Sequence, residues 1–321
     1  MSSKWWLVLA ASGVLAIGVA ACGSSDDNGD GGSSTPANLS GEIRIDGSST
    51  VGPLTEAIAE EFNGENPNVK VTVGTSGTGG GFEKFCAGET DISDASREIE
   101  SDEAKACQAK GIAYEGIQVA NDALTVAINP DNPVKCLTVD QLKSVWEPKS
   151  SVGNWNQIQG AQPSFDADLA LYSPGTTSGT FDFFTDKING EEGAQRTEGV
   201  NDIGEDDNAT VTGVSGAEGG MGYFGYSFFK ENEDKVKALE IDGGDGCVAP
   251  SPETAQDGSY YLSRPLFVYP SADALNDETV DAFLKFYLDN INAVAEQVGF
   301  ISMTDAQLSK SQEQLDSLTS G

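Results

Sequence analysis

The sequence predicts an α/β fold of about two domains, with helices covering a largely parallel sheet. Its 321 residues suffice for about two domains of ordinary size, each with its own core. Segments with the two-residue alternation of strands are interspersed with segments that have the spacing of helices. At 38% hydrophobic residues the chain can fold despite its strong charge, which therefore describes its surface.

The first half of the predicted fold alternates strands with helices. Residues 41–46 form a strand, and Pro53 opens a helix through Phe62, because proline fits the first turn of a helix. Residues 69–73 form a second strand, which runs into a glycine-rich turn. The next predicted elements are a helix over 82–87, a brief apolar stretch at 91–92, a helix over 100–110, an extended segment over 114–119 and a strand over 122–129. This order is typical of a parallel sheet covered by helices.

The second half continues the alternation. Thr138 caps a helix within residues 137–146, because its hydroxyl can accept from the free amides of the first turn. The elements predicted after it are a strand over 169–172, a helix over 181–188, strands over 220–226, 236–241 and 264–269, and a helix through Val280, Phe283, Leu284 and Tyr287.

Three predicted strands end in turns of glycine, serine and threonine that open a helix. These turns are residues 48–50, 75–81 and 176–180. Main-chain N–H groups at a helix start lack intrahelical partners and lie at the positive end of the helix dipole, so such turns favour anions. One such turn also fits an ordinary loop or cap, but three in one chain favour an anion site.

Composition excludes several classes of function. The chain has 51 Asp and Glu against 18 Lys and Arg, a formal net charge of −33, which argues against a nucleic-acid surface. It has no histidine, so Ser-His-Asp and Cys-His nucleophiles and His-ligated metal sites are impossible. The glycine run lacks the Gly-Lys-Ser/Thr ending of a P-loop and does not reproduce GxGxxG. An enzyme would therefore have to work with carboxylates, Lys, Tyr or a cofactor. We expect no bound nucleotide or other cofactor and no metal.

Two acidic pairs could suggest catalysis or calcium. Glu191-Glu192 and Asp206-Asp207 stand in loop-like sequence without the spacing of an EF-hand. Both pairs are interpreted as solvated loop charges.

The N-terminus predicts export and anchoring. Lys4 precedes an apolar run over residues 5–21, which is typical of a secretory signal, with a plain transmembrane anchor as the alternative. The small residues before Cys22 resemble the lipobox of bacterial lipoproteins. This resemblance implies that residues 1–21 are removed and that Cys22 is lipidated at the extracytoplasmic face of the cell membrane. Residues 22–40 then form the lipidated end and a flexible tether rich in Gly, Ser and Asp.

Six separated segments agree, in order and spacing, with one known family. They read DGSSTVGPLTEAIAEEF, GTSGTGGGFEKFCAGETDISDASREI, DALTVAINP, LTVDQLKSVWEP with NWNQI, SPGTTSGTFDFFTDKI and GGMGYFGYSFF. These segments closely resemble the phosphate-binding lipoproteins of bacterial phosphate ABC importers. The resemblance runs from about Gly41 to the C-terminal helix.

The resemblance implies the type II periplasmic-binding-protein fold. In that fold two α/β lobes, each a mixed sheet flanked by helices, are joined by a two-strand hinge and close around one anion. Lobe 1 would comprise residues 41–121 and 249–321, and lobe 2 residues 122–248.

Cysteine usage fits an oxidising compartment. Four cysteines remain beside Cys22, an even number that allows three pairings, with four free thiols as the alternative. Under the lobe division implied by the resemblance, we favour Cys86 with Cys107 and Cys136 with Cys247, because each pair would lie within one lobe.

The resemblance also implies which residues bind phosphate. They come from the three turns and from the wall formed by residues 91–97, and they are Ser49, Thr50, Val51, Thr78, Ser96, Arg97, Asp122, Ser178, Gly179 and Thr180. In one branch of the family the anion-pairing arginine stands four residues before Ser-Gly-Thr, where this chain has Pro174. In that branch an aspartate also stands in place of Ser96. We therefore expect Arg97, from lobe 1, to be the fixed cation, with an exposed surface charge as the alternative.

A carboxylate would explain selectivity between oxyanions. Hydrogen phosphate still carries a proton at neutral pH and sulfate does not, so a buried acceptor repels sulfate. Asp122 would either accept this proton or orient Arg97, and Asp94 is the other candidate acceptor. The alternative for Asp122 is a surface cap at the end of a strand.

The sequence therefore predicts a monomeric, lipid-anchored solute-binding protein, not an enzyme, that delivers inorganic phosphate to the permease of an ABC importer. The permease would recognise the closed form. Receptors for another tetrahedral oxyanion and secreted phosphate-ester hydrolases are the alternatives, and an adhesion lipoprotein is the least specific one.

Overall fold

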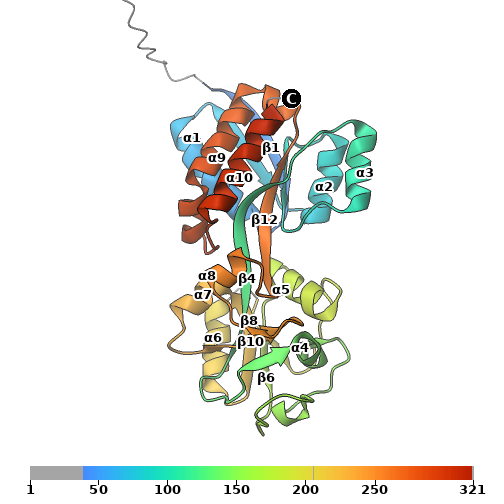
Figure 1. The fold of residues 1–321 in the computed structure, drawn as a ribbon, viewed down its shortest axis with the longest axis vertical. Helices are drawn as coiled ribbons and strands as arrows, with labels where there is room; N and C mark the ends of the chain where they lie inside the picture. The colour runs from blue at the N-terminus through green and yellow to red at the C-terminus, as the bar shows by residue number, and fades with distance from the viewer. Residues whose placement is uncertain (1–38, 205, 320–321) are drawn as a thin grey trace, which may run out of the picture. The chain divides into compact units, whose positions relative to one another are not determined.

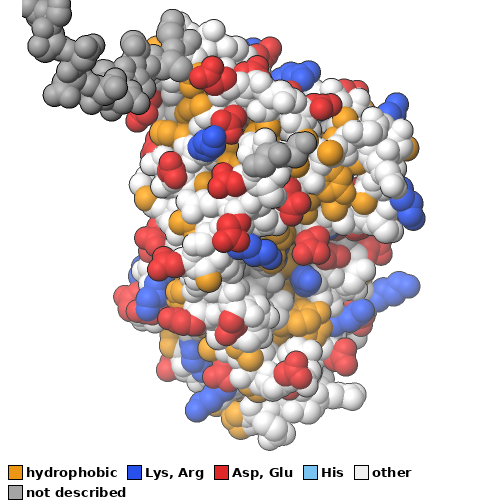
Figure 2. Space-filling view, turned by 45° about the horizontal axis from the view of Figure 1, so that its top comes forward, with side chains coloured by type: hydrophobic (Ala, Val, Ile, Leu, Met, Phe, Trp, Pro, Cys, Tyr) orange, Lys and Arg blue, Asp and Glu red, His pale blue; other side chains and the backbone are white. Residues whose placement is uncertain are grey.

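The computed structural model describes residues 39–204 and 206–319 (Figure 1). The predicted signal peptide over residues 1–21, Cys22 and the predicted tether as far as residue 38 lie outside the described residues. Within the described part of the chain, every helix is too short or too polar to cross a membrane. Acidic side chains are scattered over the face seen in Figure 2, as the net charge of −33 leads one to expect.

The predicted fold class is confirmed: the described residues form two α/β lobes joined by two long strands, β4 (Ile117–Ile128) and β12 (Ser263–Pro270) (Figure 1). The main elements of lobe 1 are β1 Gly41–Gly47, α1 Gly52–Glu65, β2 Val69–Gly74, α2 Thr78–Ala87, β3 Ile92–Ala95, α3 Ser101–Lys110, η3 Ala274–Asn276, α9 Glu278–Gln297 and α10 Asp305–Thr319. Those of lobe 2 are β5 Cys136–Thr138, α4 Val139–Trp146, η1 Trp155–Gln157, β6 Ala170–Ser173, α5 Gly179–Phe184, η2 Thr185–Asn189, β7 Val200–Asp202, α6 Asp207–Gly216, β8 Gly220–Gly225, α7 Tyr226–Glu231, β9 Lys237–Ala238, β10 Glu240–Asp242, β11 Cys247–Val248 and α8 Pro252–Gln256.

One sheet runs through both lobes. Its strand order is β2-β1-β3-β12-β4-β8-β6-β7, with β9 paired to β4, and a separate small sheet has the order β11-β10-β5. The strands β1, β2 and β3 are parallel, as are β6, β7 and β8. β12 is antiparallel to both β3 and β4, and β4 is antiparallel to β8. In the parallel part of each lobe, the turns that follow the strands lie at one edge of the sheet. The three turns of glycine, serine and threonine therefore face the space between the lobes.

Each lobe buries an apolar core on both faces of its sheet. In lobe 1, α1, α9 and α10 cover one face through residues such as Phe62 and Phe283, and α2 and α3 cover the other through Phe82 and Phe85 (Figure 1). In lobe 2, Trp146 belongs to the larger core cluster, and a smaller cluster forms around α6 and Phe224. The two lobes therefore have largely separate cores connected by β4 and β12, although Ile301, between α9 and α10, packs into the larger cluster of lobe 2.

The predicted cysteine pairing is confirmed. Cys86 on α2 is bonded to Cys107 on α3, and Cys136 on β5 is bonded to Cys247 on β11. The first disulfide fixes the helix that follows the glycine-rich turn to its neighbour, and the second closes the small sheet of lobe 2.

Three sequence predictions about elements are wrong. β4 is one strand where the sequence predicted two, because the polar pair at its centre is buried and paired: Asn121 donates to the Ser302 carbonyl at 3.2 Å and Asp122 accepts from Arg264. α6 and α7 were not predicted. Asp206, interpreted as a loop charge, instead caps α6 by accepting from the Ala209 amide at 3.3 Å.

The predicted return to lobe 1 at residue 249 is also too early. Ala255, Tyr260 and Leu262 lie in the larger core cluster of lobe 2. The Tyr260 hydroxyl donates to the Leu124 carbonyl at 2.9 Å. Apolar packing therefore keeps α8 in lobe 2, and the chain crosses back along β12.

Candidate anion-binding site

The first turn connects β1 to α1. The Ser48 amide donates to the Asp94 carbonyl at 2.9 Å, and the Ser48 hydroxyl accepts from the amides of Thr50 and Val51 at 3.2 and 3.4 Å. The Val51 side chain is fully buried in the core of lobe 1. This packing holds the turn rigid and leaves Ser49 and Thr50 at the cavity between the lobes.

The glycine-rich turn opens α2. Gly77 has φ +84°, a left-handed conformation that glycine adopts without strain, and α2 begins at the next residue without a side-chain cap. The Thr78 hydroxyl accepts from the Ser96 amide at 3.2 Å and lies 3.1 Å from the Ser96 hydroxyl. The turn after β2 and the loop after β3 therefore meet at one wall of the cavity.

The third turn comes from lobe 2. Ser178 is the N-cap of α5, and its hydroxyl accepts from the Thr180 amide at 3.3 Å. A Cβ atom at Gly179 would collide with the Thr50 hydroxyl and lie 3.3 Å from the Ser49 hydroxyl. The absence of a side chain at Gly179 thus allows the turns of the two lobes to come into contact across the cavity.

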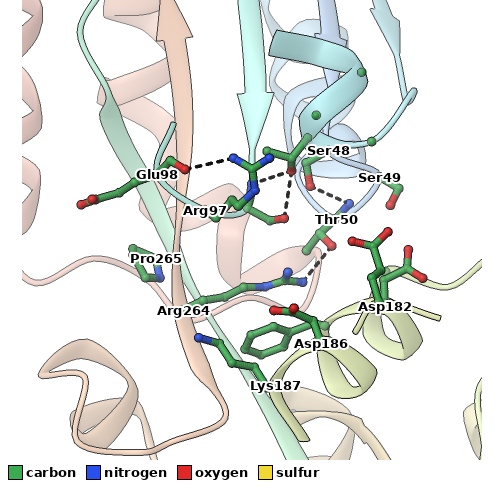
Figure 3. Close-up of a pocket in the computed structure, with 18 of the residues that line it drawn as sticks. Ser48, Ser49, Thr50, Arg97, Glu98, Asp182, Asp186, Lys187, Arg264 and Pro265 are labelled. Carbon is green, nitrogen blue, oxygen red and sulfur yellow. Dashed lines mark hydrogen bonds between the residues drawn. The ribbon is translucent and has the colours of Figure 1, made fainter. Parts of the chain in front are cut away.

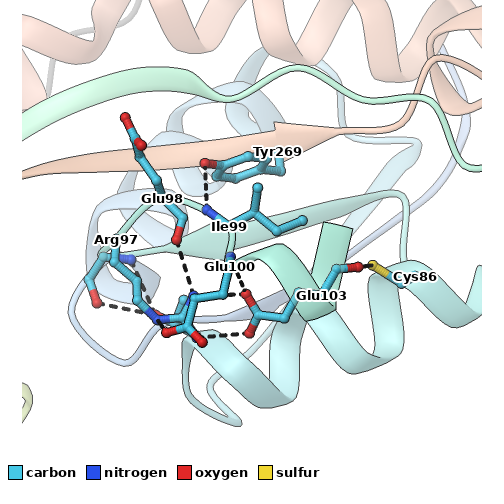
Figure 4. A network of polar contacts seen from close by, with 9 residues as sticks. Cys86, Arg97, Glu98, Ile99, Glu100, Glu103 and Tyr269 are labelled. Carbon is cyan, nitrogen blue, oxygen red and sulfur yellow. Dashed lines mark hydrogen bonds and ion pairs between the residues drawn. The ribbon is translucent and has the colours of Figure 1, made fainter. Parts of the chain in front are cut away.

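Arg97 is held by carboxylates of lobe 1 (Figure 4). Its guanidinium makes two hydrogen bonds to Glu103, both of 2.8 Å, and lies 3.4 Å from Glu100. Glu103 also accepts from the Glu100 amide at 2.8 Å, which closes the capping box of α3. These hydrogen bonds raise the pKa of Arg97, and 37% of its side chain is exposed.

Arg264, on β12, is the most deeply buried cation at the cavity. It stands opposite Asp122 in the β12/β4 register, and its Nε donates to Asp122 Oδ2 at 3.1 Å. Its Nη2 donates to the Thr50 hydroxyl at 3.0 Å (Figure 3). Its Cζ lies 4.0 Å from the ring centre of Phe183. The Arg264 side chain is 12% exposed, and burial lowers its pKa while Asp122 raises it.

The cavity between the lobes has a volume of about 850 Å³. Its charged lining consists of three cations, Arg97, Lys187 and Arg264, and five carboxylates, Glu98, Glu100, Asp182, Asp186 and Glu192. Figure 3 labels the three cations and Glu98, Asp182 and Asp186. The charge of this lining is therefore negative, so attraction of an anion depends on particular donors and not on the cavity as a whole. Burial raises the pKa of Asp182, Glu192 adds to this rise, and Arg264 opposes it.

The chemistry available in this cavity is binding by hydrogen bonds and charge. Hydroxyl groups, helix-start amides and guanidinium groups are the donors that proteins use for tetrahedral oxyanions. Among the described residues, the potential metal ligands that converge are Cys136, Cys247 and Glu240, and the two cysteines are joined as a disulfide.

Comparison with known proteins identifies the family. The family model described as the PBP superfamily domain matches residues 32–290. The Phosphate-binding protein PstS of Staphylococcus saprophyticus is 38% identical over 324 residues, covering 98% of this chain and 95% of the relative. The chain belongs to the PstS family of phosphate-binding proteins. Protein SphX of Synechococcus elongatus is 44% identical over 265 residues, covering 81% of this chain and 77% of the relative.

A solved relative of this PstS family member has the same fold. The crystal structure of a possible phosphate binding protein from Planctomyces limnophilus is 43% identical, with a TM-score of 0.81, and the match covers 88% of this chain and 99% of that one.

The structure of this PstS family member brings six of the ten predicted site residues to the cavity. They are Ser49, Thr50, Thr78, Ser96, Arg97 and Gly179. The other four, Val51, Asp122, Ser178 and Thr180, are not among its lining residues. Val51 and Ser178 instead support the turns from behind, and Asp122 is the partner of Arg264.

The other candidate acceptor, Asp94, lies away from the cavity. It is fully buried, and neither carboxylate oxygen has a hydrogen-bond partner among the described residues. Burial raises the pKa of Asp94 to about 8. Its main-chain contact to Ser48 supports the first turn, but Asp94 is not among the residues that line the cavity.

Sequence reasoning missed Arg264 and Glu192. Glu192, interpreted as a solvated loop charge, lines the cavity. The available signal for Arg264 was an arginine near the start of a strand whose later residues, 266–270, are buried, since a charge beside such a strand needs a partner or a ligand.

Proposed function

We propose that this protein is an extracytoplasmic, lipid-anchored receptor that captures inorganic phosphate between its two lobes and delivers it to the permease of an ABC importer. One observation carries the proposal: three helix-start turns, from both lobes, lie at a single cavity that also holds two guanidinium groups. Membership of the PstS family and the names of its relatives support phosphate as the anion.

The hydrogen-bond donors at the cavity explain how phosphate would be bound. Thr50, Thr78 and Gly179 would supply hydroxyl and amide hydrogens, and an arginine would supply the fixed charge. A bound anion contacts turns of both lobes at once, so it stabilises the closed arrangement more than the open one. The permease then recognises that closed arrangement, and phosphate leaves unchanged.

The location and anchoring belong to the same proposal. Cys22 would carry the lipid, and the tether after it would hold the folded lobes at the membrane surface. The protein would act as a monomer, because the cavity is formed within one chain.

Titration calorimetry with phosphate, sulfate and arsenate tests the proposal, together with an assay for hydrolysis of p-nitrophenyl phosphate. We expect saturable binding of phosphate and arsenate, rejection of sulfate and no hydrolysis. Absence of phosphate binding would refute the receptor. Preferential binding of sulfate would assign another oxyanion, and sustained hydrolysis would indicate the esterase alternative.

A further inference from the structure

Arg264 occupies the point where the two lobes and the connecting strands meet. One of its hydrogen bonds reaches Thr50 in the first turn of lobe 1 (Figure 3). Another reaches Asp122 on β4, and its guanidinium stacks on Phe183 of lobe 2. Within the described residues, no other arginine lining the cavity contacts side chains of both lobes in this way.

The guanidinium retains donors for a ligand. An arginine has five N–H groups, and the hydrogen bonds described for Arg264 use two of them, one on Nε and one on Nη2. The residue lines the cavity, so the remaining N–H groups have access to an anion held beside Thr50. Two parallel N–H groups match the edge of a phosphate.

We propose that Arg264 is the principal cation for the anion and that Asp122 is a positioning residue that holds Arg264 rather than the acceptor of the phosphate proton. This inference rests on the proposed function, because it names the residue that supplies the charge at the same site. It differs from the sequence prediction, in which Arg97 supplies the charge.

Burial favours Arg264 over Arg97. The side chain of Arg264 is 12% exposed and that of Arg97 is 37% exposed. Charge interactions are screened less in the drier environment. Arg264 therefore attracts an anion more strongly at the same distance.

The carboxylate partners of the two arginines also favour Arg264 as the cation for the anion. Arg97 is neutralised by a two-bond contact with Glu103 and faces Glu100 as well. Arg264 shares one hydrogen bond with Asp122, although Asp182 and Asp186 also act on it electrostatically. A second acceptor can thus bind Arg264 without breaking its ion pair.

The position of Asp122 indicates that it orients Arg264 and does not contact the anion. Its carboxylate is 10% exposed, is bonded to Arg264 and is absent from the cavity lining. A proton acceptor must reach the phosphate oxygen directly. Asp122 instead fixes the direction of the guanidinium, as a strand neighbour in register can.

The experiment measures phosphate and sulfate affinity of the purified protein and of five variants by calorimetry, with thermal unfolding recorded for each. Removal of Arg264 alone would leave Asp122 as an unpaired buried charge, so the main variant is the double change Arg264→Gln with Asp122→Asn. Arg264→Lys keeps the charge and loses the planar fork. Arg97→Gln provides the comparison between arginines, and Arg44→Gln is the matched control, since Arg44 lies on the surface beside Asp91.

We expect at least a hundredfold loss of phosphate affinity in the double variant, about a tenfold loss in Arg264→Lys, a smaller loss in Arg97→Gln than in the double variant, and unchanged affinity in Arg44→Gln. Affinity of the folded double variant within threefold of wild type would overturn the inference. If the double variant does not fold, Arg264→Lys decides, and unchanged affinity there overturns the inference.

Asp122→Asn, made alone, tests the positioning role. We expect it to weaken phosphate binding moderately and to keep the ratio of phosphate to sulfate affinity. Collapse of that ratio would make Asp122 the proton acceptor and overturn this part of the inference. A wild-type protein that binds no phosphate would refute the proposed function and the inference together, whereas unchanged variants of a binding wild type would refute the inference alone.

Discussion

The buried carboxyl group of Asp94 predicts an unusual dependence of stability on pH. Asp94 is 0% exposed, and its two oxygens have no hydrogen-bond partner among the described residues. The polar Thr55 side chain, whose hydroxyl lies 3.0 Å from that of Tyr287, lowers the pKa of Asp94, whereas burial and the like charges of Asp46 and Glu56 raise it and prevail. The protonated form is therefore the stable form in the folded protein.

The magnitude follows from proton linkage. Burial raises the pKa of Asp94 from 3.8 to about 8. Between these values the unfolded chain has released the proton and the folded chain keeps it, so the free energy of unfolding falls by about 1.4 kcal/mol per pH unit as pH rises. At pH 7 the accumulated loss is about 4 kcal/mol, and above the folded pKa the loss levels off.

Asp94→Asn keeps the shape of the neutral acid and cannot ionise. We expect this variant to exceed wild type in free energy of unfolding at pH 7 by at least about 2 kcal/mol, after about 2 kcal/mol is allowed for the buried amide. By the same figures the gain should fall to zero near about pH 5 and become a deficit of about 2 kcal/mol below the unfolded pKa. The assay is urea unfolding, followed by circular dichroism at several pH values from about 4 to 9. Glu60→Gln, which alters an exposed carboxylate on α1, is the control.

The reasoning would be refuted if wild type and Asp94→Asn lost stability with pH at the same rate. A variant less stable than wild type at every pH would likewise show that Asp94 is held as a charged group by interactions that outweigh its burial.

Three further predictions concern the contact between the two lobes, the association rate of phosphate and the two disulfides. Gly179→Ala should weaken phosphate binding at least tenfold, about 1.4 kcal/mol, because the added Cβ would collide with the Thr50 hydroxyl. The unfolding temperature should not fall. An affinity equal to that of wild type, measured by calorimetry, would contradict this prediction. The association rate of phosphate, measured by stopped flow, should rise with added salt, since the net charge of −33 repels the anion at long range; a falling rate would show local attraction to dominate. Replacing Cys136 and Cys247 by serine should lower the free energy of unfolding by about 5 kcal/mol, and replacing Cys86 and Cys107 by about 3 kcal/mol. The two disulfides close loops of 111 and 21 residues, and the longer loop loses more entropy when it is closed. A larger loss for the Cys86–Cys107 pair in urea unfolding would contradict this explanation.

The local parts of this fold could be predicted from the sequence. The strand and helix alternation of lobe 1 and the turns before α1, α2 and α5 follow from short patterns of apolar residues, proline, glycine and hydroxyl side chains. The six predicted residues at the cavity belong to these turns or to the loop after β3. Local chemistry sets the conformation of a turn, so it is visible in a few consecutive residues.

Features set by distant contacts could not be predicted in the same way. Asp122 and Arg264 are 142 positions apart in the chain and meet only through the β12/β4 register. The polar centre of β4 looks like a break until its buried partners are known, and α8 remains with lobe 2 because Tyr260 packs there. The resemblance to the family predicted that Arg97 supplies the positive charge for the anion. The burial of each arginine could not be predicted in this way, because it depends on how the lobes are assembled.

Locating the bound anion in a crystal shows directly whether both lobes hold it. Crystals grown with arsenate allow the anion to be located from the anomalous scattering of arsenic. We expect one strong peak between the turns of the two lobes, within about 3 Å of donors of Thr50, Thr78, Gly179 and Arg264 once the oxygen atoms are built. A peak elsewhere on the protein, or no peak in crystals of a protein that binds arsenate in solution, would contradict it.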